Sequence, residues 1–278
     1  MENRTTKYME DKVKYVRIML ALNERKKLLN DKGHEVVGVF LQGSQNYNLD
    51  YENSDIDCKA IIIPKFNDFA LNRKQVSTTH IMDNNEHIDL KDIRIMLDNI
   101  KKQNINFVEI LFTPYTILNN DYSQLFKPLL DNNELIARYD ILTSIKSMVG
   151  MCYEKYKALE HPYPNTIEQI KKFGYSGKQL HHILRIQEFL ERYVEGESYK
   201  DCLISRNPEY LINVKRSCHT LEEARTLAKE SCDAVYAIRE KYRDYSGGVN
   251  EEVGKLIDEV KVNIIKEGFI KELSLNGI

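Results

Sequence analysis

The stretch at residues 36–64 constrains the fold of this chain more than any other: VVGVFLQGSQNYNLDYENSDIDCKAIIIP. It opens with a run of apolar, largely β-branched residues, 36–41, which predicts a buried strand. Gly43 and Ser44 end that run, and ten polar, turn-prone residues separate them from a second run. We therefore expect two strands, at 36–41 and 55–63, joined by a polar loop.

Two carboxylates stand at the start of the second predicted strand. Asp55 and Asp57 are two positions apart, and residues i and i+2 of a strand point to the same face. Two adjacent carboxylates repel each other, and a divalent cation between them removes that penalty. Gly43 allows backbone N–H groups to approach an anion, and Ser44 adds a hydroxyl donor. Together the two motifs predict a triphosphate held beside a metal.

Gly43-Ser44, the ten-residue gap and Asp55-Ile56-Asp57 between apolar strands resemble the signature of the DNA polymerase β-like nucleotidyltransferase superfamily. The sequence of this motif resembles that of predicted nucleotidyltransferases of bacteria and their phages. The resemblance covers about residues 34–112. It implies two Mg²⁺ ions, with Mn²⁺ as a substitute, on Asp55, Asp57 and a third carboxylate. It also implies transfer of a nucleoside monophosphate from an NTP, ATP foremost, to a hydroxyl, with release of pyrophosphate.

Three residues compete for the role of the third carboxylate. Asp89 fits best because it lies on a predicted strand with Ile88 and Leu90 on the opposite face. Asp92 stands where a helix should begin, and an Asp there is explained by capping and the helix dipole. Glu86 is expected to belong to a turn. The resemblance would place Asp89 on the metal nearest the acceptor, where it would help to deprotonate the hydroxyl.

A second candidate constellation occurs in the sequence GYSGKQLHHILR at residues 174–185. On a helix, Lys178 precedes His182 by four residues, and Arg185 lies two turns after Lys178, so the three share a surface. We expect them to contact the nucleotide phosphates, with a solvated basic face as the alternative. Two further polar residues, Glu109 and Tyr47, are expected to serve structural pairing and loop packing.

The pattern of elements predicts an α+β fold. Strands are expected also at 75–82 and 87–90, helices at 5–30 and 91–102, and either structure at 106–112. Strand signals fade beyond about residue 120, and four long helices are predicted, at 133–159, 177–193, 221–245 and 251–273. We therefore expect a catalytic domain with a mixed sheet at 1–130 and an all-helical domain at 131–278.

Composition limits the partners of this chain. Apolar residues make up 42% and charged residues 29%, and the net charge is −2, as in soluble globular proteins. The net charge of the whole chain therefore gives no indication that it binds nucleic acid. The acceptor therefore stays open between an RNA or tRNA end, a small molecule and a protein side chain. A non-catalytic nucleotide-binding or antitoxin-like module is the alternative. The charged N-terminus and short apolar runs predict a cytoplasmic protein without membrane contact.

Overall fold

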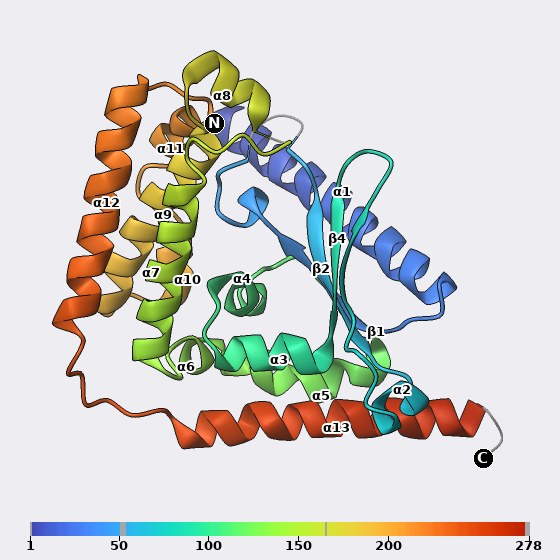
Figure 1. Ribbon diagram of the computed structural model, residues 1–278. Helices are drawn as coiled ribbons and strands as arrows, with labels where there is room; N and C mark the ends of the chain where they lie inside the picture. Colours follow the sequence, from blue (N-terminus) through green and yellow to red (C-terminus); the bar gives the residue numbers. More distant parts are fainter. Residues whose placement is uncertain (1, 51–53, 165, 276–278) are drawn as a thin grey trace.

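The computed structural model describes residues 2–50, 54–164 and 166–275. A twisted sheet stands at its centre, with helix α1 on one side and a layer of helices on the other, while a group of long helices lies apart from the sheet (Figure 1). No helix in the described ranges is both long and apolar enough to cross a membrane.

The sheet has five strands in the order β3-β4-β2-β1-β5. β2 and β4 run parallel, and the other neighbouring pairs are antiparallel. The bounds are β1 (Glu35–Gln42), β2 (Asp57–Ile63), β3 (Ser77–Ile81), β4 (His87–Asp92) and β5 (Thr116–Leu118). The mixed sheet followed by a helical part confirms the predicted α+β class.

The four predicted strands all form, although β2 begins at Asp57, two residues later than expected. The ambiguous segment 106–112 is helical, as α4 (Ile105–Val108) followed by the 3₁₀ turn η2 (Glu109–Leu111). The short strand β5 was not anticipated. Its three residues are too few to show an alternating pattern, and pairing with β1 defines it.

Different helices cover the two faces of the sheet. Helix α1 (Glu2–Asp31) packs on the face that carries Cys58, Ala60 and Ile62 of β2. The opposite face, with Ile61 and Ile63, is covered by α3 (Ile93–Lys101), α5 (Asn120–Asp131) and α13 (Glu251–Leu275). The alternation of β2 thus feeds two separate cores, as the period of two in a strand requires.

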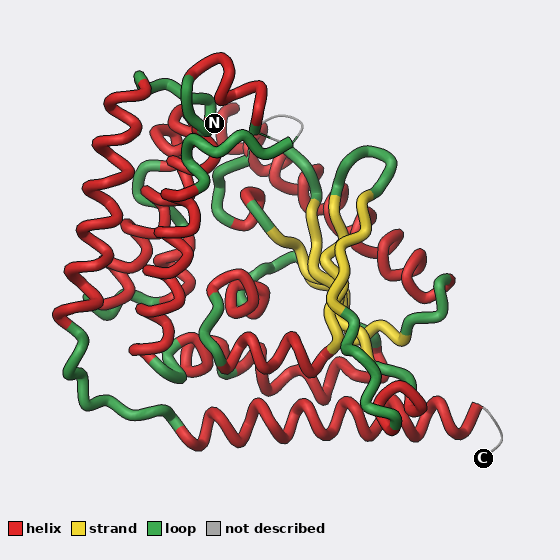
Figure 2. The backbone as a smooth tube through the Cα atoms, viewed as in Figure 1, coloured by secondary structure: helices red, strands yellow, loops and turns green. Residues whose placement is uncertain are grey.

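The helical part contains more helices than the sequence pattern predicts (Figure 2). The helix expected at 133–159 is divided, because the Asp140 side chain accepts a hydrogen bond from the Thr143 N–H at 3.0 Å and caps a new helix. The bounds are α6 (Asn133–Ala137), α7 (Ile141–Lys157), α8 (Ile167–Phe173), α9 (Gly177–Val194), α10 (Tyr199–Leu203), α11 (Pro208–Lys215) and α12 (Leu221–Lys241).

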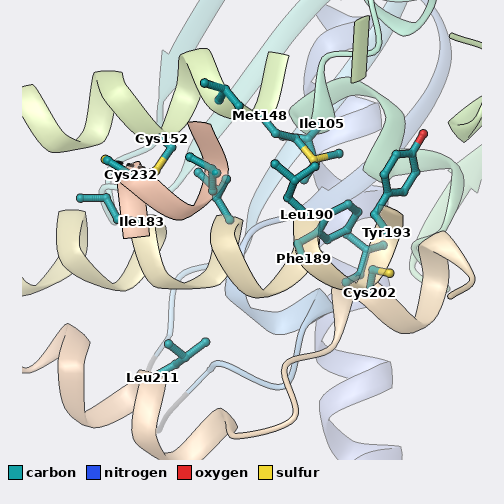
Figure 3. Packing of buried hydrophobic residues seen from close by; sticks show 14 of the residues in the cluster. Ile105, Met148, Cys152, Ile183, Phe189, Leu190, Tyr193, Cys202, Leu211 and Cys232 are labelled. Carbon is teal, nitrogen blue, oxygen red and sulfur yellow. Dashed lines mark hydrogen bonds between the residues drawn. The ribbon is translucent and has the colours of Figure 1, made fainter. Parts of the chain in front are cut away.

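Helix α9 lies at the centre of this part and packs against α7, α11 and α12. Its side chains Ile183, Phe189 and Leu190 enter a core shared with Met148 of α7 (Figure 3). The same core contains Ile105 of α4. The helical part is therefore joined to the sheet part by continuous apolar packing beside the end of β1.

Helix α13 returns from the helical part to the sheet. It packs along α5 and α3, and a Cβ atom on Gly268 would lie 2.6 Å from the Ile63 side chain of β2. The close approach needs a glycine at that position. The domain boundary at residue 130 stays a prediction, and the last helix beyond it covers the sheet that precedes it.

Candidate active site

The Gly-Ser turn is held in a defined conformation at the end of β1. Gly43 has a φ of 92°, a left-handed value that favours glycine, and Ser44 begins the 3₁₀ turn η1 (Ser44–Asn46). The buried side chain of Gln45 then donates through Nε2 to the backbone oxygen of Asp55 at 2.8 Å. The turn and the Asp-x-Asp segment are thereby fixed to each other, although residues 51–53 between them lie outside the described residues.

Asp57 begins β2, and Ile56 before it is buried in the core beneath α1. The shared face of Asp55 and Asp57 stays a prediction, because Asp55 precedes the strand. Asp57 is 37% exposed, and its Oδ1 accepts a hydrogen bond from the His87 N–H at 2.8 Å. Asp55 is exposed. Both carboxylates can therefore reach a ligand without first leaving a buried partner.

Asp89 lies on the same side of the sheet, with Ile88 and Leu90 buried on the other. It stands opposite Lys59 in the parallel register, and its carboxylate pairs with Lys59 at 2.5 Å and with Lys91 at 2.7 Å. Burial alone would raise the pKa of Asp89, but the two ammonium groups outweigh burial and hold that pKa below its usual range. The third-ligand role of Asp89 stays a prediction, and its carboxylate is engaged with two cations.

The two competing carboxylates have structural partners. Asp92 caps α3, where its Oδ1 accepts from the Arg94 N–H at 2.9 Å, as expected for an Asp at a helix start. Glu86 precedes β4, accepts from the Ile56 N–H at 2.8 Å and forms an ion pair with Arg25. Both carboxylates are therefore accounted for by local structure.

A cavity of about 350 Å³ lies between the end of β1 and helices α7 and α9. We call it the Gly43 cavity. Gly43, Lys178, His182 and Arg185, four of the five predicted nucleotide-binding residues, all line it. Ser44 follows Gly43 directly in η1. Gly43 and Lys178, which are more than 130 positions apart in the sequence, thus line the same cavity. Only the family resemblance allowed this meeting to be predicted from the sequence.

Asp57 lies at the margin of the Gly43 cavity. It stands directly opposite Gln42 in the antiparallel register, and Gln42 lines the cavity. Side chains of directly opposed residues share a face, with Cβ atoms roughly 5 Å apart. The carboxylate pair and the cavity are therefore neighbours, separated by the width of one strand.

Tyr47, Glu109 and Arg185 form a buried cluster in the wall of the cavity. The Tyr47 hydroxyl donates to Glu109, the Arg185 guanidinium stacks over the Tyr47 ring at 3.8 Å, and an Arg185 nitrogen lies 3.9 Å from Glu109 Oε2. Glu109 is 5% exposed, and burial raises its pKa against the opposing effect of Arg185. The structural pairing expected for Glu109 and the packing role expected for Tyr47 agree with these contacts.

The three predicted basic residues of α9, Lys178, His182 and Arg185, differ in charge and exposure. Burial lowers the pKa of His182 well below its usual value, so this ring is neutral at neutral pH. Its neighbour His181 turns away, with Nδ1 2.9 Å from the Leu211 backbone oxygen. Lys178 is exposed in the first turn of α9, where the helix dipole also favours an anion. Lys178 is therefore the most available cation of the set.

Several lining residues carried no signal in the sequence. Gln42 and Gln179 line the cavity, and in the described structure their buried Oε1 atoms have no hydrogen-bond partner. Buried polar atoms are normally paired, so these two indicate a polar ligand or water in the cavity. Ile105, Met151 and Phe189 supply apolar wall. Only the position of Gln42, directly before Gly43, could have drawn attention to it.

Asp55 and Asp57, at the margin of the Gly43 cavity, provide some of the ligands that a divalent cation needs. Asp55 and Asp57 offer carboxylate oxygens, which Mg²⁺ prefers, and proteins often hold Mg²⁺ with one or two carboxylates plus substrate phosphates. Within residues 2–50, 54–164 and 166–275, no three His, Cys, Asp or Glu side chains converge as a metal site. A cation would therefore have to share the carboxylate pair with a bound phosphate.

Comparison with known proteins adds little to this geometry. No protein-family model matches the sequence, and no curated protein matches it. A nucleotidyltransferase-like protein from Exiguobacterium sibiricum 255-15, known from a crystal structure, aligns over 86% of each chain with 15% identity and a TM-score of 0.30. That TM-score is too low to decide the fold or the activity of this chain.

Proposed function

We propose that this chain is a metal-dependent nucleotidyltransferase, which moves a nucleoside monophosphate from an NTP to an acceptor hydroxyl. The carrying observation is that Gln42, which lines the cavity together with Gly43 and Lys178, stands directly opposite Asp57 in the sheet. A cation-lined cavity next to exposed carboxylates suits a triphosphate with its metal. The resemblance of the Gly43-to-Asp57 motif to polymerase β-like nucleotidyltransferases points the same way.

The residues of the chain have separate roles in this proposal. The backbone at Gly43 and Ser44 and the Lys178 ammonium bind the phosphates, while neutral His182 donates or accepts a hydrogen bond. The Tyr47–Glu109–Arg185 cluster holds Arg185 rigid beside them. A Mg²⁺ held by Asp55 and Asp57 would stabilise negative charge on the phosphates.

The proposed transfer makes one bond and breaks one. An acceptor oxygen attacks the α-phosphorus, the bond from that phosphorus to the bridging oxygen of pyrophosphate breaks, and pyrophosphate leaves. The acceptor hydroxyl gives its proton to a nearby carboxylate, the role that the resemblance assigns to Asp89. An RNA end is our first candidate for the acceptor, and a small molecule or protein side chain is the alternative.

The test is transfer of label from α-³²P-ATP with Mg²⁺ to RNA, protein and small-molecule pools. We expect transfer to one pool, and loss of at least about a thousandfold in D55N/D57N, because charge stabilisation worth several kcal/mol is removed. The matched control is D31N/D244N, which removes two exposed carboxylates elsewhere and should leave transfer unchanged. Equal activity in both double variants would refute the proposed site.

One observation favours a second function, a non-catalytic nucleotide-binding module. Asp89 is paired with Lys59 and Lys91, so the described structure offers two available carboxylates rather than three. Equilibrium dialysis with labelled ATP separates the two functions. Binding that is lost in K178Q, together with no label in any acceptor pool, would support the binding module over the enzyme.

A further inference from the structure

A second and larger cavity lies at the opposite end of the sheet. Its volume is about 580 Å³, within the range of small-molecule sites, and it opens where β1 begins at Glu35 and β2 ends at Ile63. We call it the His34 cavity. Seven residues of β2, at about 3.3 Å each, place it roughly 20 Å from the Gly43 cavity. It is therefore separate from the proposed transfer site.

Every carboxylate that lines the His34 cavity already has a partner. Glu35 accepts from Lys271 and from the Tyr122 hydroxyl, both at 2.8 Å, and Asp92 is bound by Arg94. The remaining two also have partners: Asp68 pairs with Arg73 at 2.8 Å, and Glu272 accepts from the Phe66 N–H at 2.8 Å. The acidic groups are thus used by the protein itself.

Three lysines lining the same cavity have no such partner. The ammonium groups of Lys32, Lys65 and Lys74 make no ion pair or hydrogen bond with any residue that the structure describes. They come from three segments, the end of α1, the start of α2 (Phe66–Ala70) and the approach to β3. Uncompensated charges of one sign around a concave surface create a potential that attracts an opposite charge. The surplus of cations around this cavity favours an anionic ligand.

The remaining lining describes the rest of that ligand. Ile63 and Pro64 form a buried apolar floor. His34 also lines the cavity. Burial, followed by the nearby charges of His80, Lys32 and Lys65, lowers the pKa of His34, so its ring is neutral and can donate one hydrogen bond. Cations on the rim and an apolar floor suit a ligand with both a charged and an apolar portion.

We propose that the His34 cavity binds a phosphate-bearing small molecule of nucleotide size. Its phosphate oxygens bind Lys32, Lys65 and Lys74, and its apolar portion lies on Ile63 and Pro64. A phosphate ester carries more than one negative charge and several acceptor oxygens, which matches three ammonium groups better than a single carboxylate does. The site needs no divalent cation, since no free carboxylate lines it.

The experiment follows the imidazole signals of the full chain by NMR during titration with ADP in EDTA. The chain has seven histidines, and H34Q and H182Q assign the two that report on the two cavities. EDTA suppresses binding that depends on a metal. We expect ADP to shift the His34 signal, and K32Q/K65Q/K74Q to weaken that apparent affinity by at least about tenfold, because charged hydrogen bonds are removed.

The matched control is K102Q/K241Q/K255Q, which removes three exposed lysines on other surfaces and should leave the ADP affinity at His34 unchanged. All six lysines are exposed, so neither triple variant removes a buried contact. No shift of His34 with millimolar ADP would overturn the proposal, and so would equal affinity in the two variants. A shift of the His182 signal alone would also overturn the proposal for the His34 cavity. It would not contradict the proposed transfer site.

Discussion

The two ends of the sheet offer the same elements and use them differently. A glycine with positive φ stands beside each end of β1, Gly33 at 81° and Gly43 at 92°, and each lines a cavity. In the Gly43 cavity, the buried Glu109 contacts Tyr47 and Arg185, and the Arg185 side chain is 15% exposed. In the His34 cavity, the cations that remain unpaired are exposed to water.

This difference has a physical meaning. A buried charge costs several kcal/mol unless it is paired, and once paired it is held rigid in a region of low dielectric. An exposed ammonium costs little to keep, and its attraction is screened by salt within about 10 Å. The Gly43 cavity is therefore organised in advance, as the proposed transfer requires, whereas the His34 cavity suits the proposed reversible binding of an anion.

The largest expected effect on stability comes from breaking the buried pair. R185M leaves Glu109 buried beside Tyr47 without its cation and should lower the free energy of unfolding by about 3 kcal/mol. K271M at the other end removes a cation from Glu35, where both side chains are about one-third exposed, 35% and 37%. That loss should stay below about 1 kcal/mol. Urea denaturation measures both.

A double variant sharpens this prediction. E109Q/R185M removes both charges, so it should recover much of the stability lost in R185M. If K271M costs as much as R185M, or if the double variant is no better than R185M, burial does not distinguish the two ends as described.

The next effect is a loss of stability in acid. Burial lowers the pKa of His181 to about 4, from a usual value of 6.5, so the unfolded chain binds more protons between these values. Stability from this group is present above pH 6.5 and should fall by about 3 kcal/mol as the pH drops to 4. In H181Q, the free energy of unfolding should change less between pH 6.5 and pH 4 than in the unmodified chain. The control H161Q, at an exposed histidine, should keep the full change.

The smallest effect compares the two glycines directly. A Cβ at Gly43 or Gly33 would meet no atom within 4 Å, so G43A and G33A each add only backbone strain, about 1 kcal/mol. Turnover should fall at least about tenfold in G43A, because the phosphate-binding backbone shifts. It should stay unchanged in G33A. A similar loss of turnover in both variants would show that the two ends are coupled.

Much of the fold could be predicted from local patterns. The strand at 36–41 follows from a continuous apolar run, and the strand at 87–90 follows from apolar alternation. Asp92 was recognised as a cap because helix starts have a residue-level signature. Val13 and Val16 lie within the helix predicted at 5–30, yet they are 65% and 47% exposed. Periodicity identifies a helix, but it does not say how much of the helix a partner covers.

The site was predictable only in its short-range parts. The spacing of Gly43, Asp55 and Asp57 lies within one stretch of sequence, and strand geometry fixes their faces. Tertiary structure alone paired Asp89 with Lys59, since that contact depends on the parallel register of β2 and β4. It also made His182 neutral, because burial rather than residue type sets that pKa.

The sequence by itself therefore determined which residues can carry chemistry and on which face of a strand or helix they lie. These properties depend on residue type and on backbone periods of two and 3.6. Only the tertiary structure decided that α9 closes a cavity over Gly43, and that three unpaired lysines meet around His34. Burial and charge compensation arise between segments distant in sequence, and no local pattern encodes them.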